Sequence, residues 1–377
     1  MAVKIVRQPN KIALLGSPTS AAAMSVGHEG APAALRAAGL IDRLRSVGYE
    51  VADFGDDPPQ KFKQDDESPR ARNISAVLAS LESLKPRIEQ AVKSAALPLI
   101  LTGDCSPVLA TVAGLRRYFR HVSLIYMDRD ADLLTPATTS SGCLDGMVIS
   151  HAAGRGAAEL VRFWGEPPLV REPDIALFGV NRLEPTEEEV LRTSPVRRYL
   201  ADEVKRIGAA AAAQAAVERI QGKGYECVLH FDVDVIADFE ATNNPGTGGL
   251  SLEEVREALE VFARQKHVAA IEVAAYNPLK DSDGKGATLI IDLLADILEK
   301  RLKILQEESP STPVEKAASP ERSVSQALAT SEPLPPAASG EAWSSDDLDA
   351  PSEPAPSEQE DSEARSANPG DTGDPAA

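Results

Sequence analysis

Short apolar runs alternate along residues 10–304 with longer segments whose apolar positions recur at helical spacing. The short runs predict strands at residues 11–16, 50–55, 97–103, 122–128, 174–180, 196–200, 227–235 and 268–276. The longer segments predict helices over residues 31–47, 75–95, 106–119, 209–223, 251–265 and 286–304. Strands that alternate with helices in this way predict a mainly parallel sheet covered by helices on both faces.

Acidic residues follow three of the predicted strands. They are Asp104 beside Cys105, then Asp128, Asp130 and Asp132 in "MDRDAD", and finally Asp232 and Asp234 in "FDVDV". In parallel sheets ligands gather at the carboxyl ends of the strands, so these side chains are expected to lie together. Carboxylates brought together repel one another unless a cation lies among them. The pattern therefore predicts a metal site at one edge of the sheet.

Two other motifs share this spacing of aspartates. An EF-hand loop that began at Asp128 would need Gly at its sixth position and Glu at its twelfth, where the chain has Leu133 and Thr139. The EF-hand interpretation therefore fails. Asp-x-Asp at a strand end also resembles the nucleophile motif of haloacid-dehalogenase-type phosphatases, but the Gly-Asp-x-x-x-Asp expected later in the chain is missing. A phosphatase remains a secondary hypothesis.

The charge of the chain is concentrated at its C-terminus. The net charge is −19, and residues 306–377 contribute −13 of it, from 16 acidic and 3 basic residues. This segment also holds 11 of the 28 prolines and many Ser and Ala residues. Such a composition buries too little apolar surface to offset the entropy of ordering, which predicts a disordered acidic tail after a folded domain of residues 1–305. The tail is interpreted as a solvated spacer or as a partner-binding segment around Trp343.

Composition also limits the partners and the location. The acidic chain has no basic patch, so nucleic acid is not expected to bind, and a small-molecule substrate is favoured. No apolar run approaches the roughly 18 residues that cross a bilayer, and the N-terminus lacks a signal-peptide core, which predicts no membrane association. Three cysteines are too few for a disulfide framework. We therefore expect a cytoplasmic protein.

Five motifs in order resemble the arginase and agmatinase (ureohydrolase) family over roughly residues 10–304. They are "GSPTSAAAMSVGHEGAPAALRAAGL", "TGDCS", "MDRDADLLTP", "SSGCLDGM" and "FDVDV" followed by "PGTGGLS". The resemblance implies a three-layer αβα fold with a mainly parallel eight-stranded sheet, assembled as a homo-oligomer, a trimer or hexamer. It also implies a two-manganese site that hydrolyses guanidino or amidino C–N bonds.

The resemblance implies six metal ligands, of which two differ from the family pattern. The six are Cys105, Asp128, Asp130, Asp132, Asp232 and Asp234. Cys105 and Asp130 stand where the family usually has histidines. Carboxylates suit Mn²⁺, which is the expected ion of both positions, whereas the thiolate favours Zn²⁺ or Fe²⁺ as alternatives. The added negative charge makes a bound water less acidic than it would be in a site with neutral imidazoles.

Catalytic roles also come from the resemblance. Asp132 would orient the metal-bound hydroxide, and Asp145 stands in the "SGCLDGM" loop at the place of a proton-donating histidine. His151 and His28 are alternative proton shuttles, and His28 is also a candidate for substrate binding. His230 is in phase with Asp232 along its strand, yet its depth favours a core histidine.

Substrate recognition departs furthest from the family. Ala275 stands before Asn-Pro where arginases have a glutamate that binds the guanidinium, and Glu272 is at an odd offset from it, on the opposite face of the strand. By resemblance Glu184, Glu187 and Ser141 contact the rest of the substrate, including its ammonium. An amine-bearing substrate other than free arginine is therefore favoured. The two glutamates could instead be the solvated first turn of a helix.

Two functions from different classes remain open. The first is a metal-dependent hydrolase of C–N bonds in a linear amidine or guanidine, acting through a metal-bridging hydroxide. The second is a catalytically silent arginase-fold protein with a scaffolding or regulatory role, suggested by the loss of both metal histidines, the loop histidine and the guanidinium-binding glutamate. Retention of the aspartates at the strand ends favours the first, because unpaired buried carboxylates are costly to a fold that has no use for them.

Overall fold

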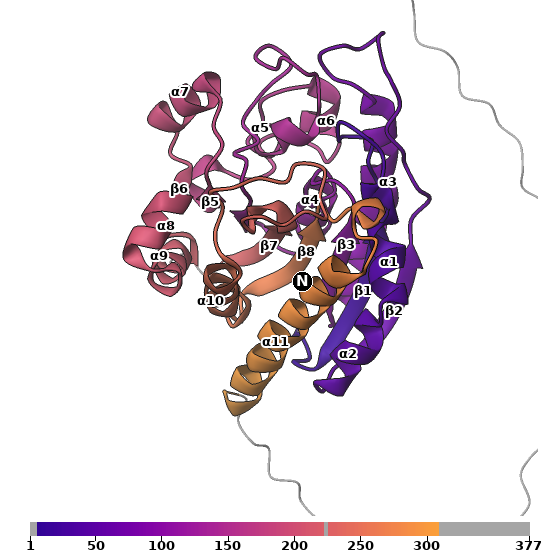
Figure 1. Cartoon of the computed structure of the whole chain (residues 1–377), viewed down its shortest axis with the longest axis vertical. Coiled ribbons are helices and arrows are strands. Elements are labelled where there is room, and N and C mark those ends of the chain that lie inside the picture. Colours follow the sequence, from indigo (N-terminus) through magenta and orange to yellow (C-terminus); the bar gives the residue numbers. More distant parts are fainter. Residues whose placement is uncertain (1–5, 222–224, 309–377) are drawn as a thin grey trace, which may run out of the picture. The chain divides into compact units, whose positions relative to one another are not determined.

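The computed structural model describes residues 6–221 and 225–308, which are built around a single eight-stranded sheet (Figure 1). The strand order is β2-β1-β3-β8-β7-β4-β5-β6, and every pair of neighbours is parallel. The strands are β1 Lys11–Ser17, β2 Glu50–Asp56, β3 Leu97–Thr102, β4 Val122–Met127, β5 Ile175–Val180, β6 Arg197–Leu200, β7 Glu226–Asp232 and β8 Val268–Ala274. All eight predicted strands are present, and the predicted fold class is confirmed.

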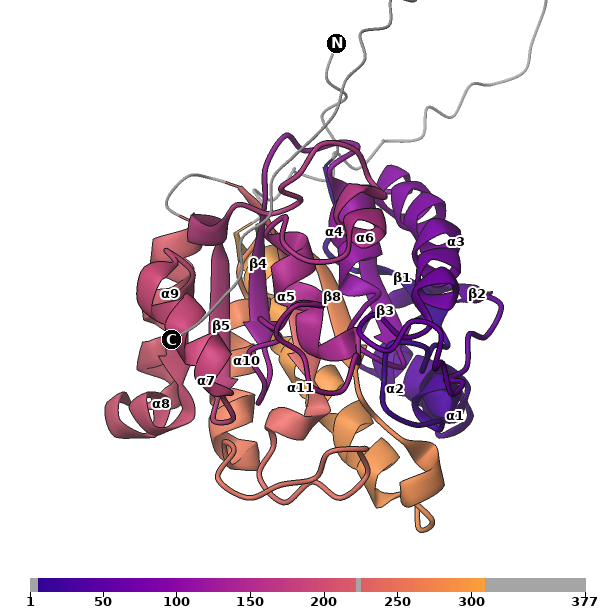
Figure 2. The same cartoon turned by 90° about the horizontal axis from the view of Figure 1, so that it is seen from above.

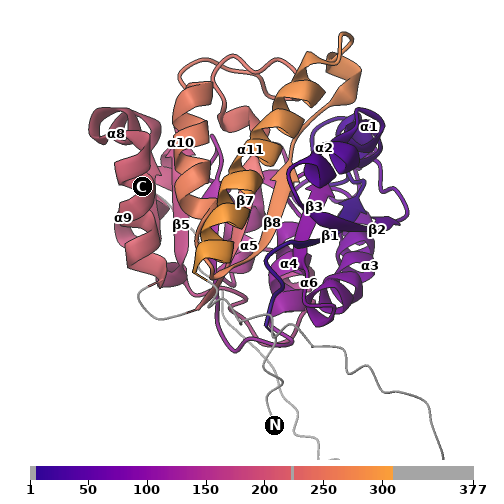
Figure 3. The same ribbon diagram turned by 90° about the horizontal axis from the view of Figure 1, so that it is seen from below.

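Helices cover both faces of this sheet, as Figures 2 and 3 show from opposite sides. One face carries α3 Ile74–Lys93, α4 Val108–Leu115, α5 Val148–Ala152 and α6 Ala158–Arg162. The other carries α1 Ala31–Ala37, α2 Leu40–Ser46, α8 Ala201–Ile207, α9 Ala209–Gln221, α10 Leu252–Ala263 and α11 Lys285–Glu307. The short α7, Pro185–Thr193, follows β5. Because both faces are covered, strands such as β3 and β4 are buried throughout, which explains their continuous apolar sequences.

The helix predictions differ from the structure in two ways. The helix predicted over residues 31–47 is divided into α1 and α2 at Gly39, whose φ of 95° places it in the left-handed region where helices end. The short helices α5 to α8 were not predicted, since five to nine residues give too few turns for a periodic signal. Helix α9 ends at Gln221, and the last residues predicted for it lie outside the described part of the chain.

The carboxyl ends of β3, β8, β7 and β4 are neighbours in the sheet, so the acidic segments meet at its centre. Gly103, just after β3, lets the loop after β1 cross this edge, because a Cβ there would lie 1.7 Å from the Thr19 carbonyl oxygen. Asp104 fixes the same loop by accepting hydrogen bonds from the Thr19 hydroxyl (3.1 Å) and the Ala22 N–H (3.0 Å). Asp104 therefore has a structural role at the rim.

Helix α11 ends at Glu307, and from residue 309 the predicted acidic tail lies outside the described residues. Among the helices of residues 6–221 and 225–308, each is too short or too polar to cross a membrane.

Candidate metal centre

A cavity of about 350 Å³ opens at the carboxyl edge of the central strands. Its lining includes His28, Cys105, Asp128, Asp130, Asp132, Ser141, Asp145, Arg182, Glu184, Glu187, Asp232, Asp234 and Ala275. The cavity lining thus includes every candidate site residue from the sequence except Asp104, His151 and His230. Residues from the ends of β3, β4, β7 and β8 meet here, as expected for a ligand site of a parallel sheet.

Two sets of ligand atoms in and beside this cavity are close enough to surround a cation. The inner group consists of Cys105, Asp128, His230 and Asp232, with ligand atoms within 4.8 Å of one another and all four residues buried. The outer group consists of Asp128, Asp130 and Asp234, under the same distance limit, and its Asp130 is partly exposed. Asp128 belongs to both groups. Asp132 belongs to neither, although it lines the cavity.

The local sequence explains why these aspartates point into the cavity. His230 and Asp232 are two positions apart on β7 and so share one face of the strand. The strand then ends in a turn in which Asp232 Oδ1 accepts the N–H of Asp234 at 2.7 Å. Asp128 directly follows β4 and makes the same turn, accepting the N–H of Asp130 at 2.7 Å. Each Asp-x-Asp therefore closes its own turn, which aspartate favours.

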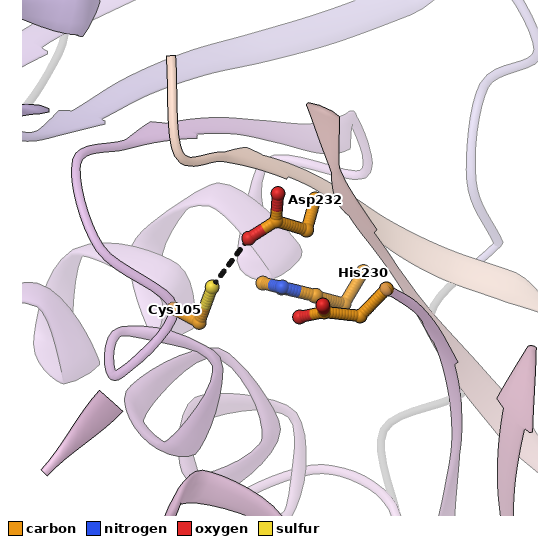
Figure 4. A group of neighbouring side chains, drawn as sticks. Cys105, His230 and Asp232 are labelled. Atoms are coloured by element: carbon orange, nitrogen blue, oxygen red, sulfur yellow. Dashed lines mark hydrogen bonds between the residues drawn. The ribbon is translucent and has the colours of Figure 1, made fainter. Parts of the chain in front are cut away.

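The inner group is linked by hydrogen bonds. The Cys105 thiol donates to Asp232 Oδ2 over 3.0 Å, and Figure 4 shows His230 beside this pair. His230 Nδ1 lies 3.0 Å from Glu272 Oε1, and both side chains are fully buried. The other imidazole nitrogen, Nε2, is buried without a hydrogen-bond partner among the described residues.

The outer group has a competing partner. Asp130 forms a two-point ion pair with Arg182, whose Nε and Nη2 each contact one carboxylate oxygen. Arg182 also lines the cavity, so the negative charge of Asp130 is already balanced within the protein. In addition, Oδ1 of Asp234 is buried without a partner among the described residues.

Asp132 is held by a separate contact. Its backbone is left-handed, with φ of 51°, a conformation uncommon outside glycine. The Tyr126 hydroxyl donates to Asp132 Oδ2, which leaves the other carboxylate oxygen for the cavity. This arrangement keeps Asp132 beside the two groups of ligand atoms and outside them.

The electrostatics of the protein without metal are unfavourable at this edge. Burial, followed by repulsion from Asp232, raises the pKa of Asp128 well above its usual range. Burial, followed by the charge of Asp145, does the same to the pKa of the Cys105 thiol. Burial raises the pKa of Asp234 to about 6 and that of Asp145 to about 8. A divalent cation removes this repulsion, so the donor atoms and their charge fit a metal.

The candidate proton shuttles occupy different places. Asp145 lines the cavity, and its Oδ1 accepts the N–H of Cys105 at 2.8 Å. His28 also lines the cavity, and burial lowers its pKa to about 4. His151 is buried elsewhere: its Nε2 accepts the Ala157 N–H at 3.2 Å, and it has a second hydrogen bond with the Met147 backbone. The structure therefore does not place His151 with the other candidates.

The candidate substrate contacts also differ from one another. Glu187 is buried, and its two oxygens accept the N–H groups of Leu133 and Glu184, each at 2.9 Å. It forms a capping box with Glu184 at the start of α7 and is therefore no solvated residue. Glu184 is exposed at the mouth of the cavity. Ser141 lines the cavity and accepts the Cys143 N–H at 3.1 Å.

Sequence reasoning did not select Arg182. It assigned His230 to the core, and the structure confirms that this side chain is fully buried. The sequence indicated only that His230 and Asp232 share one face of their strand. It did not show that Glu272, which accepts a hydrogen bond from Thr111 (2.7 Å), also contacts His230. For Arg182 no local signal exists, since its partner Asp130 lies 52 positions earlier in the chain.

Comparisons with known proteins agree with one another. A family model described as the Arginase family matches residues 10–299. An arginase of Bacillus caldovelox is 28% identical over 295 residues, which covers 77% of this chain and 99% of the relative. The crystal structure of an arginase from Bacillus cereus superposes with a TM-score of 0.70 at 26% identity, over 77% of this chain and 98% of that one. Proclavaminate amidino hydrolase of Streptomyces clavuligerus, at 19% identity and a TM-score of 0.60 over 80% and 96% of the two chains, shares the fold.

Proposed function

Because the chain belongs to the arginase family, we propose that it is a divalent-metal-dependent hydrolase of C–N bonds in a linear amidine or guanidine. The observation that carries the proposal is the convergence of aspartates from β4 and β7 with a cysteine after β3 in one cavity. Without a cation, repulsion among these buried groups would destabilise the fold, and no other interaction of these groups would compensate for it.

Different side chains around the cavity are suited to different steps of such a hydrolysis. A divalent cation held by residues that include Asp128 and Asp232 would supply a water whose pKa is lowered towards about 7. Asp132 has one carboxylate oxygen taken by Tyr126, and we assign its other oxygen to hold that water in position. Asp145 lines the same cavity with one oxygen on the Cys105 N–H, and we assign to it the proton that the leaving amine requires.

The lining also supports a substrate other than free arginine. Ala275 offers no carboxylate for a guanidinium, and Glu272 cannot replace it because its two oxygens contact His230 and Thr111. Of the two glutamates near the mouth, Glu187 has both oxygens engaged by backbone N–H groups. We therefore assign contact with a substrate ammonium to Glu184, which is exposed and lines the cavity.

The proposal is tested by incubating metal-loaded protein with guanidines, amidines and N-formimidoyl amino acids, beside free arginine, and measuring the urea, ammonia or amine released. We expect turnover of at least one compound that carries an amine, with kcat/KM for arginine at least about tenfold lower. Asp128→Asn is the negative control. Retention of metal without turnover of any compound would contradict the proposal.

A catalytically silent member of the family is the second candidate, favoured by one observation. The ion pair between Arg182 and Asp130 occupies a carboxylate that a second metal ion would need. If turnover is absent with every compound while the protein binds metal, the cation has a structural role and this second function is the better account.

A further inference from the structure

The inner group contains a histidine that the proposed reaction does not use. We propose that His230 is a metal ligand, and that Cys105, Asp128, His230 and Asp232 together hold one ion of the zinc class. The ligand atoms of these four residues lie within 4.8 Å of one another, and all four residues are buried. The inference deepens the proposed function, on which it rests only in placing a metal in this cavity.

The two imidazole nitrogens of His230 have different surroundings. Nδ1 lies 3.0 Å from Glu272 Oε1, and the second oxygen of Glu272 accepts from the Thr111 hydroxyl at 2.7 Å. Nε2 is fully buried and has no hydrogen-bond partner within the described residues. A buried polar atom left unpaired costs about 1–3 kcal/mol. A carboxylate on one nitrogen and an open second nitrogen is the usual arrangement of a metal-binding histidine.

Packing fixes the direction of that open nitrogen. The His230 ring stacks on the Tyr126 ring with centroids 4.4 Å apart and planes 5° from parallel. Tyr126 is itself fully buried and held through its hydroxyl by Asp132. Figure 4 shows the result, with His230 directed toward the space that also contains Cys105 and Asp232. Since both rings are fixed, the imidazole is held ready for a ligand before any ion binds.

The donor set favours zinc over manganese. One sulfur, one nitrogen and two carboxylates match the ligands and coordination number of Zn²⁺, whereas Mn²⁺ prefers oxygen. A tetrahedral zinc site has ligand atoms about 3.3–3.8 Å apart, so the group has to contract only modestly. The thiol proton, now donated to Asp232 over 3.0 Å, leaves to solvent as the sulfur–metal bond forms.

The composition of the outer group indicates that the cavity holds one metal ion in total, at the inner position, instead of two. It offers carboxylates alone, and Arg182 occupies both oxygens of Asp130. A cation there would have to displace or share a guanidinium held in a two-point ion pair. The structure thus assigns a complete ligand set to the inner position and an incomplete one to the outer position.

Cobalt binding tests the inference directly, because Co²⁺ occupies zinc sites and a cobalt–thiolate bond absorbs in the near ultraviolet. The full chain, purified without a metal-affinity tag and stripped with chelator, is titrated with Co²⁺ and then with Zn²⁺ or Mn²⁺. We expect one tight equivalent of Co²⁺ with a thiolate band, displaced by equimolar Zn²⁺ and retained with equimolar Mn²⁺. Tight cobalt binding without the thiolate band, or no tight binding, would overturn the inference.

Three variants separate the ligands from their surroundings. Cys105→Ser should abolish the thiolate band, while Cys227→Ser, which removes a buried thiol on the same strand as His230, should leave it unchanged. His230→Gln should weaken zinc binding at least about a hundredfold. Glu272→Gln, which keeps the imidazole, should weaken it about 10–100-fold.

The readout separates this inference from the proposed reaction. A zinc affinity that His230→Gln leaves unchanged overturns the inference even if the protein hydrolyses amidines. Conversely, a protein that binds one zinc ion through Cys105 and His230 and hydrolyses none of the compounds supports the inference and contradicts the proposed reaction. If His230→Gln does not fold, the inference is tested by two other measurements: the cobalt–thiolate band of the unaltered protein and the zinc affinity of Glu272→Gln.

Discussion

The inner and outer groups share Asp128 but use their charges differently. The inner group is buried, mixes sulfur, nitrogen and oxygen, and leaves Nε2 of His230 without a partner. The outer group is all carboxylate and partly exposed, and Arg182 already balances the charge of its Asp130. At the outer position the Arg182 side chain thus supplies the positive charge, whereas the inner position needs a metal ion. Proximity of carboxylates alone does not distinguish the two cases.

The shared ligand gives the largest predicted effect. Asp128→Asn removes one negative charge from both groups, so we expect loss of all tightly bound metal, measured by elemental mass spectrometry after desalting. Hydrolysis should fall on the order of a thousandfold, because metal stabilisation of the transition state amounts to several kcal/mol. The metal-free variant should unfold at a higher temperature than the metal-free parent protein, since repulsion with Asp232 is relieved. Metal retained at the parent level would contradict a shared ligand.

A second buried histidine is the contrast to His230. His151 has protein partners in the Ala157 N–H, which donates to Nε2, and in the Met147 backbone, and burial lowers its pKa to about 4 from the ordinary 6.5. The unfolded chain therefore binds a proton at this residue more readily, and His151 alone should lower the free energy of unfolding by up to about 3 kcal/mol between pH 6.5 and pH 4. His151→Gln should lose correspondingly less. Urea denaturation at several pH values measures the difference.

The control for this pH effect is His267→Gln, which changes a histidine next to the start of β8. Its unfolding is measured at the same pH values as that of His151→Gln. Equal slopes for His151→Gln and the parent protein would mean that His151 is not the group responsible.

The two histidines also show where sequence reasoning ends. All eight strands and the acidic strand ends were predictable, because apolar runs and Asp-x-Asp turns are local features. The surroundings of His230 depend on a partner far along the chain, whereas the partners of His151, Ala157 and Met147, are nearby backbone groups that an apolar pattern does not reveal. Glu272 lies 42 positions after His230. Which nitrogen stays open is settled only when β7 and β8 pair, with His230 opposite Glu272.

The outer position offers the next test. Arg182→Gln removes the guanidinium from Asp130, so the outer group becomes three carboxylates without a protein cation. We expect a second equivalent of Mn²⁺ to bind, with an affinity at least about tenfold higher than the outer position of the parent protein shows. Isothermal titration with Mn²⁺ after the inner position is filled with Zn²⁺ gives the stoichiometry.

The matched control is Arg192→Gln, which breaks an exposed ion pair with Glu189 on α7. Its metal stoichiometry should equal that of the parent protein. If Arg182→Gln still binds a single ion, the outer position is empty for a reason other than competition with Arg182.

The smallest effect concerns the loop after β4, which carries Asp130 of the outer group. Glu187 accepts the Leu133 N–H and the Glu184 N–H at 2.9 Å each, and so ties the loop after β4 to the start of α7. In Glu187→Gln the amide NH₂ faces one of these donors, and we expect the free energy of unfolding to fall by about 1 kcal/mol. Zinc affinity should stay within about twofold, because no residue of the inner group contacts Glu187 through these bonds. A larger loss of zinc affinity would show that the inner position also depends on this loop, and the separation between the two positions would then be wrong.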